Sequence, residues 1–198
     1  MRRIPFMALG MMALVSGLFA GVARMGWLEL SINHTRWHGP LMVSGFLGTV
    51  ISLERAIATG KRWAYLAPLL TGAAALSLVG GAPWRIAAAV ILAGSVVAAL
   101  TFVSLLRVHR SWSLATMGLG SACWVGSNVA WLLGAPLYRL VPSWMCFLAL
   151  TILGERLQLS RMVVVSRRAR RAFAVIIALT VVGAVVGAVA YDAGARLV

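Results

Sequence analysis

The chain alternates between long apolar runs and short polar breaks. The apolar runs are about twenty residues long, the length at which an α-helix crosses the hydrocarbon core of a bilayer. The breaks carry Gly-Pro, Gly-Gly or clustered basic residues. Because the breaks are short, consecutive helices are expected to pack antiparallel. The pattern predicts seven spans, at about 5–27, 38–58, 63–81, 84–106, 112–134, 140–159 and 172–194.

The composition excludes a soluble protein of this size. Of 198 residues, 62% are hydrophobic and only 11% are charged, whereas a surface in water needs far more polar groups. In lipid, backbone groups find partners only within a helix or a closed barrel. The predicted fold class is all-α: a polytopic transmembrane helical bundle that forms a single transmembrane domain over 1–198. The first apolar run is longer than the hydrophobic region of a signal peptide, so a retained first helix is expected.

The net charge of +14 is unevenly distributed along the chain. One alternate set of breaks and ends carries Arg2, Arg3, Lys61, Arg62, Arg107, Arg110, Arg161, Arg167, Arg168, Arg170 and Arg171, and the other carries Arg36, Arg85, Arg139 and Arg196. By the positive-inside rule, the N-terminus is expected in the cytoplasm and the C-terminus outside, in a bacterial cytoplasmic (inner) membrane. The positive charge favours contact with anionic lipids over binding of nucleic acid.

An internal repeat is visible at an offset of 101 residues. The matching positions are Phe46-Leu47 with Phe147-Leu148, Ile51 with Ile152, Glu54-Arg55 with Glu155-Arg156, and Gly17 and Gly21 with Gly118 and Ala122. An offset of four spans keeps the chain direction, so the predicted repeat is parallel and of the four-plus-three type. Its first copy covers about 5–106 and its second about 112–194. Since the second copy lacks a fourth helix, a shortened member of a longer family is expected.

One face of the predicted second helix collects unusual side chains. His38, Met42, Gly45, Thr49 and Ser52 follow one another at steps of four, three, four and three, which places them on a single face. A histidine inside a membrane span costs free energy and usually faces the bundle interior. Imidazole and thioether can both bind haem iron or copper. His38 and Met42 are therefore the candidate cofactor ligands, with His38 as the candidate metal ligand, against the alternative of an interfacial histidine beside a packing methionine.

The segment that holds these two residues resembles two known families. Trp37-His38-x-x-x-Met42-x-x-Gly45-Phe46 is similar to the motif of the NnrS family, polytopic bacterial membrane proteins that contain haem and copper. It also resembles the His-Gly-x-x-Met segment of haem-copper oxidase subunit I, where the histidine binds a low-spin haem. The resemblance implies haem b near His38 and Met42, with a redox or nitrosative-stress role. A haem with two axial ligands from this chain would need His34 or Met42 beside His38, and otherwise a partner subunit.

Two Glu-Arg pairs lie near the expected cytoplasmic ends of their helices. They are Glu54-Arg55 and Glu155-Arg156, at equivalent positions of the repeat. Adjacent residues on a helix point about 100° apart, so crossed ion pairs are expected, Glu54 with Arg156 and Glu155 with Arg55. A structural clamp is favoured over a proton or ion site.

The predicted fifth helix carries a further polar group, and the chain has two cysteines. Ser121, Trp124 and Asn128 share one face, which is assigned to helix packing rather than to substrate contact. Cys123 and Cys146 each fall within an apolar run and have no metal-ligand spacing, so buried free thiols are expected.

Three functions follow from these features. The first is a haem-binding protein of redox or nitrosative-stress type; whether it is an enzyme stays open, because no catalytic constellation is recognised. The second is a small transporter or channel whose path is lined by the polar stripe of the second helix. The third is a structural subunit of a larger membrane complex, docked to another membrane subunit or to further copies of itself.

Overall fold

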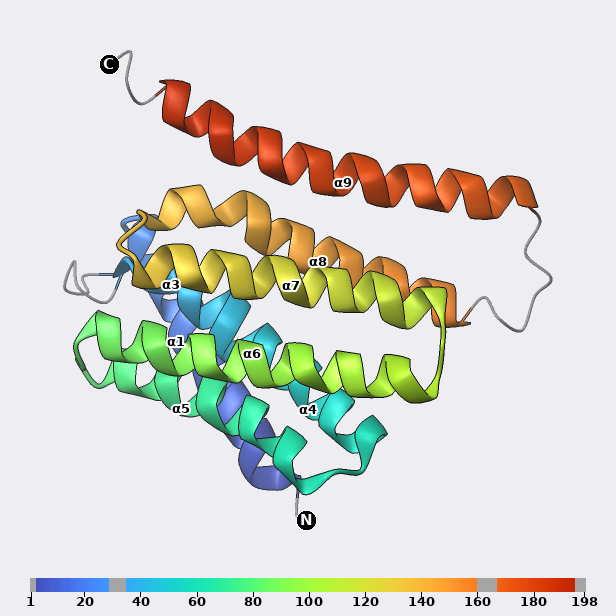
Figure 1. Cartoon of the computed structure of the whole chain (residues 1–198). Helices are drawn as coiled ribbons and strands as arrows, with labels where there is room; N and C mark the ends of the chain where they lie inside the picture. The colour runs from blue at the N-terminus through green and yellow to red at the C-terminus, as the bar shows by residue number, and fades with distance from the viewer. Residues whose placement is uncertain (1–2, 29–34, 160–166, 195–198) are drawn as a thin grey trace. The chain divides into compact units, whose positions relative to one another are not determined.

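A computed structural model describes residues 3–28, 35–159 and 167–194, and within them the chain is all-helical (Figure 1). The seven predicted helices are present. They are α1 (Ile4–Arg24); a second helix made of α3 (His38–Pro40), η1 (Leu41–Leu47) and α4 (Gly48–Thr59); a third made of η2 (Arg62–Tyr65) and α5 (Leu66–Val79); α6 (Trp84–Val108); α7 (Trp112–Leu132); α8 (Leu137–Leu159); and α9 (Arg167–Gly194). The all-α fold class is confirmed.

The helix ends lie within a few residues of the expected ones, and glycines shape several of the turns. Gly60, after α4, has a φ of 68°, and Gly134, after α7, has a φ of 95°. Side chains rarely adopt such left-handed conformations, whereas glycine does so at little cost. The largest difference is at the start of α9, which begins at Arg167 rather than at 172; α8 begins at Leu137 rather than at 140, and α1 ends at Arg24 rather than at 27.

Length and composition make several of these helices able to cross a membrane. In the described residues five helices qualify: α1, the second helix, the third helix, α6 and α8. The α7 helix is as long as α1 but is not among the five, and α9 contains a shorter apolar stretch, Ala174–Gly187. The chain is therefore a helical membrane protein with several membrane-spanning helices.

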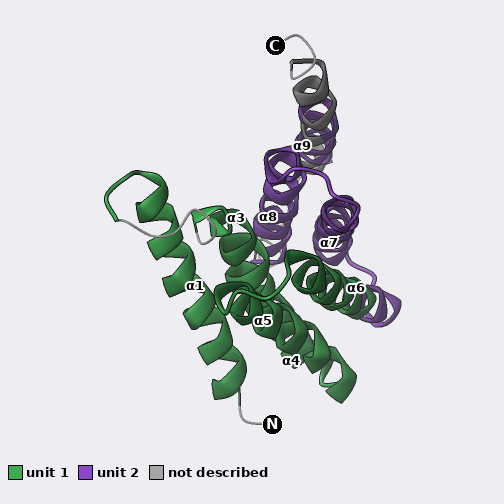
Figure 2. Cartoon of the chain, turned by 90° about the vertical axis from the view of Figure 1, so that its left-hand side faces the viewer, with its two compact units in different colours: residues 1–101 green, residues 102–198 purple. Residues whose placement is uncertain are grey.

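The chain divides into two compact units, residues 1–101 and 102–198 (Figure 2). The boundary falls inside α6, close to the expected end of the first repeat copy at about 106. In the first unit, α1 packs against both the second helix and α5. In the second unit, α7 packs along α8, and α8 contacts α9. Each unit thus has its own helix contacts, and the duplication itself stays a prediction.

One matched pair of the proposed repeat differs in its packing. A Cβ atom added at Gly17 would lie 2.8 Å from the sulfur of Met42 in the second helix. A Cβ atom at Gly118, its counterpart, would instead meet Leu106 and Phe102 of α6, at 3.6 and 3.7 Å. The two glycines therefore occupy different helix contacts.

Candidate functional site: His38 on a small-residue face of α1

The α1 helix presents a row of small residues to the second helix. Gly10, Ala13, Gly17 and Ala20 are buried and recur at steps of three and four, so they form one stripe. Small residues allow two helix backbones to approach closely in a membrane. The second helix fills the space that they leave, and its polar stripe lies against this row.

His38 and Met42 occupy neighbouring places on the small-residue stripe. A Cβ atom added at Gly21 would lie 2.9 Å from the Nδ1 atom of His38, and one added at Gly17 would lie 2.8 Å from the Sδ atom of Met42. Such distances are shorter than real contacts allow, so side chains at these two glycines would displace the imidazole and the thioether. Gly17 and Gly21 therefore leave the space that the side chains of Met42 and His38 occupy.

A hydrogen bond to the backbone orients the imidazole of His38. Its Nδ1 atom lies 2.8 Å from the carbonyl oxygen of Gly17. Because a carbonyl oxygen only accepts, Nδ1 carries the proton and donates it. Within the described residues no group hydrogen-bonds to the other ring nitrogen, Nε2. In neutral imidazole, Nε2 is then the nitrogen with a free lone pair, the form that binds metals.

Met42 packs on the same glycine that orients His38. A Cβ atom added at Gly17 would lie 2.8 Å from its sulfur, and the carbonyl oxygen of Gly17 accepts the proton of His38 Nδ1. The part of Met42 as a ligand stays a prediction.

The second helix is not α-helical throughout its length. Residues Leu41–Leu47 form a π-helix directly after Pro40, and the amide of Gly48 donates to the carbonyl of Val43, five residues back. Stretches of π-helix are rare and frequently lie at functional sites. An α-helix was expected for this segment, and no residue pattern in 41–47 indicates the wider turn.

The rest of the polar stripe is buried in helix contacts. Thr49, fully buried, lies 2.9 Å from Thr71 of α5, oxygen to oxygen. Thr71 donates its own proton to the carbonyl of Ala67 at 3.0 Å, so Thr49 is the donor between the two threonines. Ser52 is buried as well and donates to the carbonyl of Thr49. The stripe faces protein rather than lipid, as the sequence analysis required.

The middle of the stripe is too tightly packed to line a path. A Cβ atom at Gly45 would lie 2.6 Å from the Cβ of Ala75 and 3.0 Å from that of Ala13. The second helix is therefore in close contact with both α1 and α5 at this level. The transport hypothesis, which placed the path along this stripe, gains no support from the first unit.

Glu54 and Arg55 pair with each other. The guanidinium of Arg55 donates to the Glu54 carboxylate at 2.5 Å. The Arg55 side chain is only 5% exposed and that of Glu54 is 56% exposed, so the glutamate reaches back to a buried arginine. Glu155 is partly buried and Arg156 is exposed, in α8 of the other unit. The crossed pairing between the two halves stays a prediction.

Two polar side chains of α7 are buried without partners. Asn128 and Ser121 are fully buried, and neither the amide atoms of Asn128 nor the hydroxyl of Ser121 has a hydrogen-bond partner within the described residues. Trp124, between them, stacks on Phe147 of α8 with the ring centroids 4.8 Å apart. The assignment of this face to packing agrees with its burial, but Asn128 makes no hydrogen bond that would join two helices.

The two cysteines lie side by side, a relationship that the sequence analysis did not predict. The Sγ atoms of Cys123 in α7 and Cys146 in α8 are 3.5 Å apart. Both are free thiols; Cys146 is buried and Cys123 is partly exposed. Their separation of 23 residues matches no known cysteine motif. Only the antiparallel pairing of α7 with α8 could have indicated the contact.

The candidate metal site rests on one protein ligand. Within residues 3–28, 35–159 and 167–194, no three His, Cys, Asp or Glu side chains gather around a common point. His109, the other described histidine, is exposed beyond the end of α6. His34, the alternative second haem ligand, lies outside the described residues. Any further ligand to a metal at His38 would come from elsewhere.

Comparison with known proteins yields one family. The profile of a family described as a domain of unknown function (DUF8744) matches residues 3–198. No curated protein and no solved structure matches the chain.

Proposed function

Because this chain belongs to the DUF8744 family, a domain whose function is unknown, we propose a function from its own residues: a membrane protein that holds a haem b through Nε2 of His38. The proposal places the protein in the bacterial cytoplasmic membrane, in a redox or nitrosative-stress role. The resemblance of residues 37–46 to the NnrS motif suggests the cofactor, and the geometry of His38 carries the proposal.

The single observation that supports it is the hydrogen bond from His38 Nδ1 to the carbonyl of Gly17. Metal-binding histidines almost always donate their second ring N–H to a carbonyl or carboxylate, which sets the tautomer and the ring orientation and raises the basicity of the ligand. Here a glycine face on α1 both receives the proton and leaves room for the ring.

In this proposal the site offers a haem one protein ligand. His38 is partly buried and its Nε2 edge is unpaired within the described residues, whereas Met42 is held on Gly17. A haem bound there would supply one-electron chemistry or a position for a diatomic gas. In this proposal His38 binds, Gly17 orients His38, and Met42 fills the space beneath. A further ligand to the haem would come from a small molecule, a second copy of the chain or a partner subunit.

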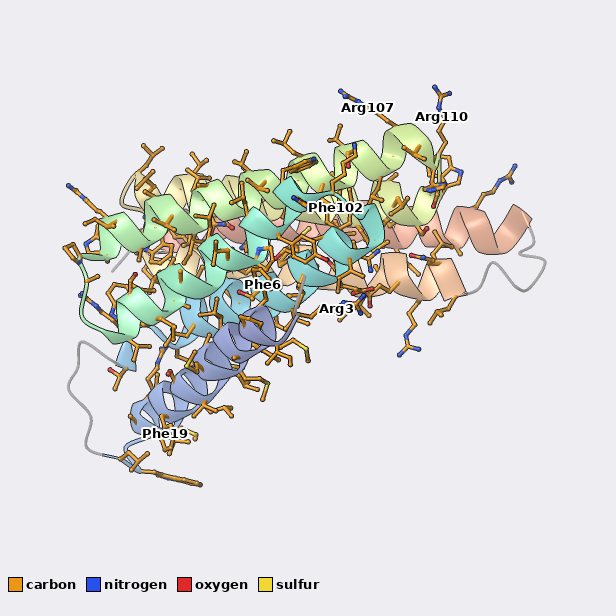
Figure 3. The ribbon with its side chains drawn as sticks, turned by 90° about the horizontal axis from the view of Figure 1, so that it is seen from below. Arg3, Phe6, Phe19, Phe102, Arg107 and Arg110 are labelled. Atoms are coloured by element: carbon orange, nitrogen blue, oxygen red, sulfur yellow. The ribbon has the colours of Figure 1, made fainter. Side chains whose placement is uncertain are left out.

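The basic residues support the proposed orientation. Arg107 and Arg110 extend away from the helices at one end of α6, as Figure 3 shows, and Lys61 and Arg62 lie where the turn after α4 leads into the third helix. These turns are expected in the cytoplasm, which puts His38, at the opposite end of the second helix, on the outer side. Arg2, Arg161 and Arg196, which also entered the count, lie outside the described residues.

The absorption spectrum of the purified protein tests the proposal. The protein is produced in cells supplied with a haem precursor and purified in mild detergent. We expect a Soret band that is absent from His38→Ala and from His38→Asn. The asparagine amide can still donate to the Gly17 carbonyl, so His38→Asn separates loss of the ligand from loss of the fold.

Two control variants sharpen the test. His109→Ala removes the exposed histidine beyond α6, and Met42→Leu keeps the volume on Gly17; both should retain the band. A colourless protein after haem supplementation would reject haem binding. A band that persists in His38→Asn and disappears in Met42→Leu would assign the ligand to the thioether instead.

A further inference from the structure

The two cysteines of the chain form a site that is separate from His38. We infer that Cys123 and Cys146 are an oxidisable dithiol that closes into a disulfide between α7 and α8, with a lipid-soluble quinone as electron acceptor. The inference rests on the second unit alone, so it stands or falls independently of the haem proposal.

The thiols are already in contact. Their Sγ atoms lie 3.5 Å apart, and a disulfide shortens this separation to about 2.05 Å. The chain contains only two cysteines, and the fold brings them together from adjacent antiparallel helices. Closing the bond therefore needs the two sulfurs to approach by about 1.5 Å, the difference between these two distances.

The helices around the cysteines are held close enough for a short cross-link. One turn before Cys123, a Cβ atom at Gly120 would lie 3.0 Å from both the Cβ of Leu150 and the carbonyl oxygen of Phe147. The neighbour of Cys123, Trp124, stacks on the neighbour of Cys146, Phe147, with the ring planes 8° apart. The glycine contact sets the distance between the helices, and the stack sets their register, so the thiols have little freedom to separate.

The surroundings of the pair select the oxidant. Both cysteines lie in the middle of long helices, and α8 is one of those able to cross a membrane. Water-soluble disulfides and peroxides partition poorly into hydrocarbon, whereas quinones dissolve in it. Cys123 is partly exposed and Cys146 is 2% exposed. The oxidant thus reaches Cys123, and Cys146 completes the bond.

The chemistry balances with a quinone. The sulfur of Cys123 adds to a quinone carbon, and its proton passes to a quinone oxygen. The sulfur of Cys146 then attacks that of Cys123, which forms the S–S bond and breaks the C–S bond. The electron pair of the broken bond returns to the ring, which becomes aromatic, and the proton of Cys146 goes to the second quinone oxygen. Two thiols and one quinone thus become one disulfide and one quinol.

The test uses the whole chain in detergent or nanodiscs, first reduced and then freed of reductant. The protein is incubated with a short-chain ubiquinone analogue, denatured, and tagged with a maleimide whose mass reports the free thiols. We expect both thiols to disappear together within one chain, with one quinol formed per protein, and to return after treatment with a phosphine reductant. Cys123→Ser should keep its one thiol, whereas Cys146→Ala should hold the sulfur of Cys123 as an adduct with the quinone; neither variant should release quinol.

Each other outcome counts against the proposal. Two thiols that stay reactive in the quinone-treated protein would reject the oxidisable pair, as would a disulfide found only between two chains. Closure by diamide without closure by the quinone would reject the quinone as acceptor. A second measurement is thermal unfolding in detergent: the oxidised protein should melt at a higher temperature than the reduced one, and the shift should be absent from both variants.

Discussion

The imidazole of His38 lies directly on Gly21, so that a methyl group added at this glycine would lie 2.9 Å from Nδ1 of the ring. Four residues earlier in α1, Gly17 accepts the proton of the same nitrogen. One glycine thus makes room for the ring and another holds it. This relationship leads to a direct test of whether the site is specified by α1.

Replacing Gly21 by alanine should loosen His38. The new methyl group forces the ring away from α1 and breaks the hydrogen bond to Gly17, and overpacking of this kind costs about 1–3 kcal/mol. We expect a lower unfolding temperature in detergent and loss of any haem absorption. Phe19→Ala is the matched control, because the side chain of Phe19, also in α1 (Figure 3), is 55% exposed. Equal stability of Gly21→Ala and the unaltered protein would contradict the close contact.

Replacing Thr71 should destabilise the protein more than replacing Thr49, its hydrogen-bond partner across the contact between α4 and α5. Thr71→Val removes the acceptor for the buried hydroxyl of Thr49, while Thr49→Val leaves Thr71 still donating to Ala67. A buried donor without an acceptor costs about 1–3 kcal/mol. We therefore expect Thr71→Val to lower the free energy of unfolding more than Thr49→Val does. Denaturant titrations of the two variants and the double variant check the order.

Asn128 should be replaceable with a gain in stability. Its amide is fully buried and makes no hydrogen bond within the described residues, so the chain bears its desolvation cost without compensation. We expect Asn128→Leu to raise the unfolding temperature. Ser127→Ala, whose hydroxyl bonds only to the carbonyl of Trp124 in its own helix, should change it little. A clear loss of stability in Asn128→Leu would mean that a bound water or ligand satisfies the amide.

The contact between α7 and α8 offers a matched pair of glycines. A Cβ atom at Gly154 would overlap the Met117 side chain and come within 2.8 Å of the Ser113 carbonyl, whereas nothing lies within 4 Å of one at Gly126. Gly154→Ala should therefore destabilise the protein by about 1–3 kcal/mol through overpacking. Gly126→Ala should be neutral or stabilising by up to about 1 kcal/mol, because alanine is the better helix former. Thermal unfolding of both variants in the same detergent tests this difference, and equal unfolding temperatures would contradict it.

The crossed ion pairs can be tested by a double-mutant cycle. We expect Glu155→Gln and Arg55→Gln to show a coupling of about 0.5 kcal/mol or more if the two side chains interact. The cycle for Glu54 and Arg156 should behave in the same way. Purely additive effects would leave Arg55 with Glu54, its partner at 2.5 Å, as the relevant pair.

Much of the fold is readable in the sequence because lipid imposes one simple rule, an apolar run of sufficient length, and the helix ends follow from it. The stripe from His38 to Ser52 is predictable for the same reason: few polar side chains are tolerated in a span, so those present face protein. That this stripe packs on the small residues of α1 could be seen only in the structure, because the spacing of glycines in a helix does not indicate which other helix they contact. Gly17 and Gly118 are an example: each belongs to a pair of small residues four positions apart, yet Gly17 contacts the second helix and Gly118 contacts α6.

The contact of the cysteines was missed because it depends on helix register, which no local pattern encodes. Cys123 and Cys146 belong to different helices, and a slip of one turn along α8 would move one sulfur by about 5 Å along the helix axis and out of contact with the other. The π-helix was missed because it comes from packing: nothing in Leu41–Leu47 differs in kind from an ordinary apolar segment.

The π-helix makes the rotation of His38 independent of one residue of chain length. A π turn holds one residue more than an α turn, so an α-helix that lacked one residue of 41–47 would join the same two flanks in the same relative rotation. If all seven residues were wound as an α-helix instead, His38 would rotate by about 100° relative to Thr49, and the imidazole would leave Gly17 while the threonines kept their bonds. A natural homologue that is one residue shorter here and has an unbroken α-helix is therefore expected to keep its histidine on the two glycines.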